Sequence, residues 1–188
     1  FALYFLEEFL EVFAQLGASR FGVALAEEGA ELRGGGIREP ILVFGHTFPD
    51  NYDLLFDYDL MPNVFTLDQA QELNECARRR KRKLTVHASV DTGLSREGFG
   101  LDEAPEGIKA VCRLPNLVLE GVFSQLAMGD FWPDNGFCRA QFARFMNLCA
   151  GLEAAGVRVP LRHICDSGAT LLYPEMHLDM VRPGTALY

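Results

Sequence analysis

Several polar residues that could do chemistry follow short apolar runs of this sequence. Each such run is typical of a buried strand. In an α/β barrel the side chains at the carboxyl ends of the strands carry the chemistry, so these positions are the candidates for a site. They are His46, Asp91, Arg96, Gln125, Asp130, Asp166, Ser167, Arg182 and Gly184.

Two of these segments together indicate an anion or cofactor site. Asp166-Ser167-Gly168 opens an expected helix, and Arg182-Pro183-Gly184-Thr185 follows the last expected strand. Backbone N–H groups at a helix start, a Ser hydroxyl and a Gly turn can cradle a phosphate, and barrels often hold phosphate after their last two strands. An Arg aimed at the same space could pair with a ring nitrogen or a carboxylate. Helix capping and a surface Arg remain the alternative interpretation.

A metal site, as in a metal-dependent barrel hydrolase, is a second and weaker hypothesis. Imidazoles and carboxylates are metal ligands, and the candidates are His87, Asp91, His163, Asp166 and Asp179. His87 and Asp91 lie four residues apart on a strand and turn, so they do not share one face. His163 is expected in the middle of a strand, where a core histidine satisfied by protein partners is the commoner outcome.

The elements that must position these residues alternate between helix and strand. Strands are expected over residues 20–24, 41–44, 63–65, 84–90, 117–126, 161–165 and 178–181. Helices are expected over 5–16, 27–33, 49–58, 68–80 with Asp68 as its cap, 102–113, 135–155 and from 166 to 172. This alternation predicts a parallel sheet. Seven strands are one fewer than a (β/α)₈ barrel needs, and the missing strand would be the first, since the sequence opens on a helix.

Composition narrows the class of protein. A chain of 188 residues suits one domain, here expected over 1–188. A net charge of −9 argues against nucleic acid and anionic membranes as partners, and the basic run from Arg78 to Lys83 is expected to be a solvated helix end. The five cysteines are scattered without a C-x-x-C motif, which predicts neither disulfides nor zinc but a reducing, cytoplasmic location. No apolar run reaches the roughly 18 residues of a spanning helix.

Four motifs carry a family resemblance. They are VDTGLSR at 90–96, GVFSQLA at 121–127, HICDSGA at 163–169 and LDMVRPGTALY at 178–188. With RFGVA at 20–24 and PILVFG at 40–45, they resemble the barrel domain of bacterial alanine racemases over nearly all of the chain. The pattern D-x-V-R-P-G-x-A-L-Y is the most specific of them.

The resemblance implies an enzyme dependent on pyridoxal 5'-phosphate (PLP) that interconverts L- and D-alanine, or serine, for cell-wall precursors. It further implies a homodimer whose sites are built from both subunits. Arg96 would lie near the substrate carboxylate and the phenolic oxygen of PLP. Arg182 would contact the pyridine nitrogen, and Ser167, Gly184 and Thr185 would hold the phosphate. An Arg at the pyridine nitrogen keeps the ring unprotonated, which weakens the electron sink and favours racemisation over side reactions.

Three positions depart from the family pattern. Gln125 stands where the family has a His that contacts the arginine equivalent to Arg182. A Gln can accept a hydrogen bond from Arg182 but cannot titrate near neutrality. Ser89 stands where many members have a Lys that helps to hold Arg96, and Asp166 stands where the family has Asn. A carboxylate at 166, beside the phosphate, is expected to weaken cofactor binding.

The acid/base groups of the family are not found in this sequence. The family's PLP lysine ends the first barrel strand, whereas the lysines here are Lys81, Lys83 and Lys109, none at an expected strand end. The second base, a Tyr of a C-terminal β-domain, is also absent. We therefore expect a fragment of a racemase that is inactive alone and that self-associates through open sheet edges. A non-catalytic barrel that binds PLP or a partner is the alternative.

Overall fold

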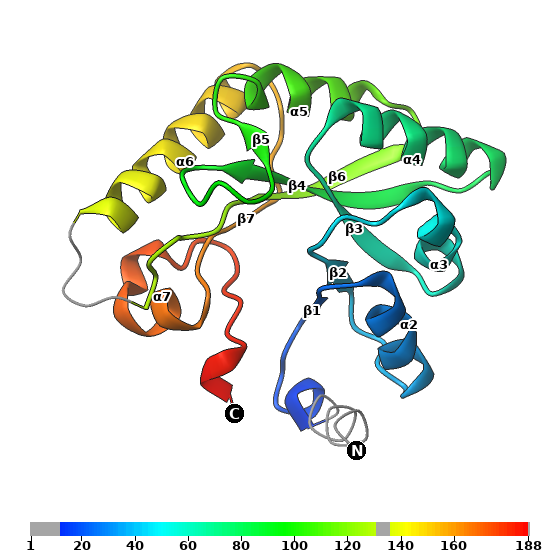
Figure 1. The fold of residues 1–188 in the computed structure, drawn as a ribbon, viewed down its shortest axis with the longest axis horizontal. Coiled ribbons are helices and arrows are strands. Elements are labelled where there is room, and N and C mark those ends of the chain that lie inside the picture. The colour runs from blue at the N-terminus through cyan, green and yellow to red at the C-terminus, as the bar shows by residue number, and fades with distance from the viewer. Residues whose placement is uncertain (1–11, 131–135, 188) are drawn as a thin grey trace. The chain divides into compact units, whose positions relative to one another are not determined.

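The computed structural model describes residues 12–130 and 136–187. The chain forms two compact units, and the boundary between them in the sequence lies between Asn63 and Val64. Each unit can be followed by colour in Figure 1. Of the helix expected over 5–16, residues 12–15 are helical, and the rest lies outside the described residues.

Parallel strands form the centre of the first unit. Its elements are β1 (Phe21–Val23), α2 (Ala26–Gly34), β2 (Ile41–Val43), the 3₁₀ turn η1 (Pro49–Asn51), α3 (Tyr52–Asp57) and β3 (Leu60–Val64). Ile41 of β2 lies opposite Phe21 on one side and Leu60 on the other, and both pairings are parallel. The expected strand over 63–65 therefore starts earlier, at Leu60, and includes Pro62.

The second unit carries the longer strands and helices. Its helices are α4 (Leu67–Arg79), α5 (Ala104–Arg113), α6 (Phe137–Ala154) and α7 (Ser167–Leu172), with the 3₁₀ turns η2 (Pro174–Met176) and η3 (Thr185–Leu187). Its strands are β4 (Leu84–Asp91), β5 (Phe99–Gly100), β6 (Leu117–Phe123) and β7 (Leu161–His163). β6 pairs in parallel with β4 and β7, and β5 pairs with the end of β4. Parallel pairing brings the carboxyl ends of β4, β6 and β7 to one edge.

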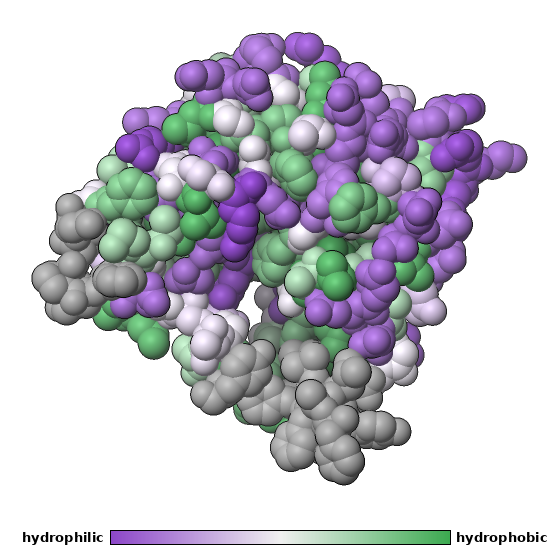
Figure 2. All heavy atoms as spheres, in the orientation of Figure 1, coloured by the Kyte–Doolittle hydropathy of each residue, from purple (hydrophilic) through white to green (hydrophobic). Residues whose placement is uncertain are grey.

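Apolar residues of helices and strands form the core of this unit. Val86 and Ala88 of β4 are fully buried, as are Leu73 of α4, Ile108 of α5 and Phe145 of α6. In Figure 1, α4, α5 and α6 lie along the same side of β4, β6 and β7, and Figure 2 shows mostly hydrophilic residues on the outer surface of α4 and α5. No helix among the described residues is long and apolar enough to cross a membrane.

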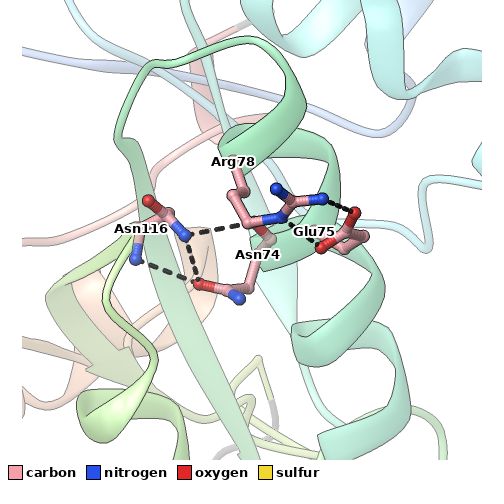
Figure 3. Close-up of polar contacts among 4 residues, drawn as sticks. All are labelled: Asn74, Glu75, Arg78 and Asn116. Atoms are coloured by element: carbon pink, nitrogen blue, oxygen red, sulfur yellow. Dashed lines mark hydrogen bonds and ion pairs between the residues drawn. The ribbon is translucent and has the colours of Figure 1, made fainter.

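A pair of asparagines joins α4 to the start of β6 (Figure 3). Asn74 Oδ1 accepts from the backbone N–H of Asn116 at 3.0 Å and from Asn116 Nδ2 at 3.1 Å. The neighbouring Glu75–Arg78 pair, with an N···O distance of 2.7 Å, lies on the exposed side of α4 and contributes little to stability. The asparagine pair therefore sets where β6 begins relative to α4.

Some expected elements differ from those observed. Thr66, not Asp68, is the N-cap of α4, because the extended Thr66 accepts from Gln69 N–H through its side chain. The strand expected over 178–181 is reduced to one bridge between His163 and Met180. There the carboxylate of Asp179 accepts from the Arg162 N–H at 2.9 Å, so this N–H bonds a side chain and not a backbone carbonyl. The strands expected over 117–126 and 161–165 end earlier, at Phe123 and His163, and β5 was not expected.

Candidate active site

An ordered turn follows β4 at the edge where the strands end. Asp91 Oδ1 accepts from the backbone N–H groups of Gly93, Leu94 and Ser95 at 2.8, 2.9 and 3.1 Å. Three hydrogen bonds to one oxygen fix the path of the turn, in which Ser95 has a positive φ of 59°. Asp91 is therefore a structural residue of this loop.

Arg96 lies beyond this turn and is exposed. Within the part of the chain that the structure describes, its side chain has no hydrogen bond or ion pair. Its charge nevertheless acts on Arg182, since Arg96 is among the groups that lower the pKa of Arg182. The two positive charges of Arg96 and Arg182 at the same edge create a positive potential, which favours binding of an anion.

Gln141 of α6 ties together the loops that follow β4 and β6. Its Oε1 accepts from Ala127 N–H at 2.9 Å, and its Nε2 lies 3.2 Å from the carbonyl oxygen of Gln125 and 3.3 Å from Thr92 Oγ1. Thr92 Oγ1 also lies 2.8 Å from Ser124 Oγ. Gln141 is fully buried, and the sequence reasoning missed it. The one sign in the sequence was the Gln141 amide among the apolar residues of this helix face.

Arg182 is the centre of the polar contacts at this edge. Its Nη1 lies 2.6 Å from His163 Nδ1, and its Nη2 donates to Gln125 Oε1 at 2.9 Å. Nη2 also lies 2.9 Å from the carbonyl oxygen of Ser124 and 3.2 Å from that of Ile164. All these acceptors are uncharged. His163, expected to be a core histidine, is buried and is a direct partner of Arg182.

Partial removal from water makes the positive charge of Arg182 less favourable. Desolvation lowers the pKa of Arg182 to about 10, and the nearby Asp166 carboxylate partly opposes this. A pKa of about 10 still leaves the guanidinium protonated at neutral pH. Its carbon lies 5.4 Å from the ring centre of Phe123, a contact that favours the cation. Arg182 is therefore a positively charged hydrogen-bond donor whose guanidinium is fixed by its partners.

Gln125 bridges Arg182 and Asp166. Its Oε1 faces Arg182, so its Nε2 is left to donate to Asp166 Oδ2 at 2.8 Å. The other carboxylate oxygen, Oδ1, caps α7 by accepting from Ala169 N–H at 2.9 Å. A Cβ on Gly129 would stand 2.6 Å from Oδ1, so only glycine allows this close approach. Both Asp166 oxygens are thus used by the protein, although the charge stays next to Ser167.

Ser167 joins the start of α7 to the segment after Arg182. Its Oγ accepts from Gly184 N–H at 2.8 Å and from Ala186 N–H at 3.1 Å. A hydroxyl that accepts twice still has its own hydrogen to donate. Among the described residues other than its chain neighbours, no atom lies within 4 Å of a Cβ built on Gly184, and Thr185 is exposed at the start of η3. The predicted phosphate residues are therefore neighbours in space.

The donors at this edge fit PLP. Arg182 supplies a cationic donor suited to a ring nitrogen, Ser167 supplies a hydroxyl hydrogen suited to a phosphate oxygen, and Gly184 leaves space beside it. The Asp166 charge opposes an anion here. Lys81 and Lys83 lie between α4 and β4, and Lys109 lies on α5, so no lysine of the chain is part of this edge. The described residues include no group of three or more His, Cys, Asp or Glu that could hold a metal.

Two further residues near the site have defined states. Burial raises the pKa of Cys165 to about 11, and its Sγ donates to the carbonyl oxygen of Met176, so this cysteine is a protonated, structural thiol. Ser89 is buried in β4, and its Oγ has no hydrogen-bond partner among the described residues. The hydroxyl of Ser89 thus makes none of the contacts that a lysine could make at this position.

The sequence matches known proteins over almost its whole length. The family described as "Alanine racemase, N-terminal domain" matches residues 5–188. Alanine racemase 1 of Caldanaerobacter subterraneus is 39% identical over 92% of this chain and 44% of its own length. The alanine racemase of Desulforamulus reducens is 41% identical over 93% of this chain and 47% of its own length. The chain spans about half the length of the curated relatives it matches.

Solved structures agree with this match. The alanine racemase of Clostridium difficile 630 superposes with a TM-score of 0.92 at 29% identity, over 97% of this chain and 48% of its own. The enzyme of Bacillus anthracis with bound L-Ala-P gives a TM-score of 0.86 at 28% identity, over 95% of this chain and 46% of its own. The predicted α/β fold of TIM-barrel type is confirmed by these neighbours. The chain belongs to the alanine racemase family, to the N-terminal domain of its members.

Proposed function

We propose that this chain is the PLP-binding barrel region of an alanine racemase and forms one partial barrel domain over residues 1–188. The observation that carries the proposal is the joining of Arg182 and Ser167 at one edge. There a half-buried cation and a hydroxyl bonded to Gly184 N–H lie on neighbouring segments. The family match supports the same assignment.

In this proposal each group has a limited task. Arg182 donates to the pyridine nitrogen, and Gln125 and His163 hold its guanidinium in place. Ser167, Gly184 and Thr185 bind the phosphate, with Asp166 fixing the start of α7 beside them. Arg96, exposed and unpaired among the described residues, binds the substrate carboxylate. When bound, PLP supplies an electron sink that acidifies the Cα–H bond of an attached amino acid.

Gln125 has a consequence for proton movement. Its amide is locked between a donor, Arg182, and an acceptor, Asp166, and an amide does not titrate near neutrality. Gln125 therefore orients Arg182 without taking a proton. The proposal assigns the two proton transfers at Cα to groups that are not among these 188 residues.

The substrate, partner and location follow from the same proposal. Relatives with this domain are named alanine racemases, so alanine is the first substrate to test and serine the second. We propose a homodimer in which the partner completes the site. All five cysteines are free, which is compatible with a reducing cytoplasm.

The binding part of the proposal is tested by titrating the protein with PLP and following cofactor absorbance and protein fluorescence. We expect saturable binding that Arg182→Leu and Ser167→Ala weaken. Asp102→Asn, which changes an exposed residue outside the site, is the control and should bind as the parent does. Equal binding by the parent and both site variants would contradict the assignment.

The catalytic part is tested on the complete gene product, by chiral chromatography of alanine and serine incubated with PLP. Appearance of the D-enantiomer, abolished in Arg182→Leu, supports the racemase. PLP binding without turnover would instead identify a non-catalytic barrel module. Light scattering of the same sample tests the dimer, and a monomer at all concentrations would contradict it.

A further inference from the structure

A row of contacts leads from Arg182 through the interior of the second unit. Arg182 Nη1 lies 2.6 Å from His163 Nδ1, and His163 Nε2 lies 3.0 Å from His87 Nδ1. His87 Nε2 in turn lies 3.1 Å from Glu120 Oε2. Both imidazoles are fully buried, whereas the Glu120 side chain is 27% exposed. We call these four side chains the Arg182–Glu120 row.

The chemistry of its two ends gives this row one proton order. Arginine has donors only, so His163 Nδ1 must accept from Arg182 and carries no proton. The single proton of that neutral imidazole is then on Nε2, which donates to His87 Nδ1. By the same argument the proton of His87 is on Nε2, which donates a hydrogen bond to the Glu120 carboxylate. Protonating either imidazole would place two donors face to face and break a contact.

A glycine makes the row possible. His87 lies on β4 and His163 on β7, and β6 runs between these strands (Figure 1). The His87 ring crosses β6 at Gly121, where a Cβ would stand 2.5 Å from His87 Nδ1 and 2.6 Å from its Cε1. Any side chain at 121 would therefore occupy the space through which His87 reaches His163.

An aromatic ring fixes the second imidazole. Phe123 stacks on His163 with ring centres 4.8 Å apart and an angle of 9° between the planes. The same Phe123 ring faces the Arg182 guanidinium at 5.4 Å. Stacking leaves the His163 ring little freedom to turn, so its two nitrogens stay directed at Arg182 and His87.

We propose that Glu120, His87 and His163 are positioning residues that hold the Arg182 guanidinium, as a hydrogen-bond donor, in one orientation. In this arrangement both imidazoles are neutral Nε2–H tautomers, and hydrogen bonds run from Arg182 toward Glu120. The row orients the guanidinium through a neutral imidazole, which is a much weaker base than the arginine side chain, so Arg182 keeps its charge and its direction. The inference deepens the proposed function and rests on the assignment of Arg182 to the cofactor ring.

The test is the protonation state of the ring nitrogens, read from long-range ¹H–¹⁵N NMR spectra of the ¹⁵N-labelled protein at pH 7. The chain has four histidines, which keeps the spectrum simple. We expect His87 and His163 to show a protonated Nε2 and a bare Nδ1. A doubly protonated ring, or a protonated Nδ1 at either residue, would overturn the proposal.

Variants of Glu120 test the direction of the row, because this side chain is the acceptor at its end and is partly exposed. Glu120→Gln keeps an acceptor oxygen and should keep both tautomers. Glu120→Leu removes the acceptor, and we expect His87 to lose its single-tautomer signal. Glu106→Leu, which removes an equal charge from an exposed residue paired with Lys109 at 2.9 Å, is the control and should change neither signal. An unchanged His87 in Glu120→Leu would refute the role of Glu120.

Gly121→Ala tests the crossing, and PLP titration separates the two proposals. The added methyl group should displace His87 and alter the His163 signals, while unaltered signals would contradict the crossing. Correct tautomers in a protein that does not bind PLP would retain the row and reject the cofactor assignment. PLP binding in a protein with other tautomers would retain the function and reject the row.

Discussion

The amide of Gln125 donates from Nε2 to Asp166 Oδ2 over 2.8 Å. By the resemblance drawn from the sequence, both positions are expected to depart from the family pattern, and in the structure they are partners. The Gln125 oxygen accepts a hydrogen bond from Arg182, so the amide nitrogen of Gln125 is the group that donates to the Asp166 oxygen. The two departures therefore fit one another: a carboxylate at 166 satisfies both Gln125 and the first turn of α7.

From this pairing we predict effects of opposite sign for Asp166→Asn. Asn has one oxygen for two donors, Gln125 Nε2 and Ala169 N–H, so one hydrogen bond is lost. Leaving a part-buried donor unsatisfied costs about 1–3 kcal/mol, which should appear in urea denaturation. Removing the negative charge beside Ser167 should at the same time tighten PLP binding in a fluorescence titration.

The control for this prediction is Asp102→Asn, the same change of charge at an exposed residue before α5. It should leave both stability and PLP affinity near the parent values. If Asp166→Asn weakened PLP binding along with stability, the carboxylate would be needed for the cofactor. That result would contradict the expectation that its charge opposes the phosphate.

Local sequence patterns predicted the elements and the edge at which the candidates meet, but not the contacts between strands. Arg182, Ser167 and Gly184 could be placed together because they follow strands or open a helix. The His87–His163 contact joins residues 76 positions apart, and it depends on Gly121 in a third strand. Nothing in a strand's own pattern indicates such a crossing. Likewise, the Asp179 side chain accepts from a backbone N–H of β7 where a strand was expected, which hydrophobic periodicity cannot show.

The hydroxyl of Ser167 is predicted to hold the segment after Arg182. Ser167→Ala removes the acceptor of the Gly184 and Ala186 N–H groups, so both amides should exchange with solvent faster in hydrogen-exchange NMR. PLP affinity should fall by about tenfold or more, because a hydrogen bond to a charged group is worth about 1.5–3 kcal/mol. Ser167→Thr keeps the hydroxyl and should restore protection of both amides. Unchanged exchange in the alanine variant would show that Ser167 does not hold this segment.

Gly168 is predicted to be indispensable at the start of α7. A Cβ there would stand 2.5 Å from Asp130 Cα and 2.7 Å from Asp130 N, and backbone atoms cannot move aside as a flexible side chain can. Gly168→Ala should therefore destabilise the protein by about 1–3 kcal/mol in urea denaturation. Gly151→Ala on α6 is the matched control, since no described residue outside the backbone of α6 lies within 4 Å of a Cβ built there. That variant should be more stable by up to about 1 kcal/mol, because Ala favours helix over Gly. Equal stability of the two variants would contradict the close contact.

The ion pair of Asp179 with Arg162 is predicted to stabilise the end of β7 in a pH-dependent manner. The Arg162 Nε–Asp179 Oδ2 distance is 2.8 Å, and this hydrogen bond is the main cause that holds the pKa of Asp179 below its ordinary value of 3.8. A depressed folded-state pKa gives stability that is fully present above the unfolded-state pKa and is lost as the pH falls through the folded-state pKa. Asp179→Asn should thus lower the free energy of unfolding by less than about 1 kcal/mol at pH 7, since the pair is partly exposed.

The difference between parent and Asp179→Asn should shrink as the pH falls below 3.8, because the parent then loses the same charge. Urea denaturation at several pH values between about 7 and 2 measures this, with Asp102→Asn again as the control for a change of net charge. A difference that stays constant into the acid range would mean that the effect of the substitution does not depend on the charge of Asp179. The charge of the pair would then contribute nothing to the stability of β7.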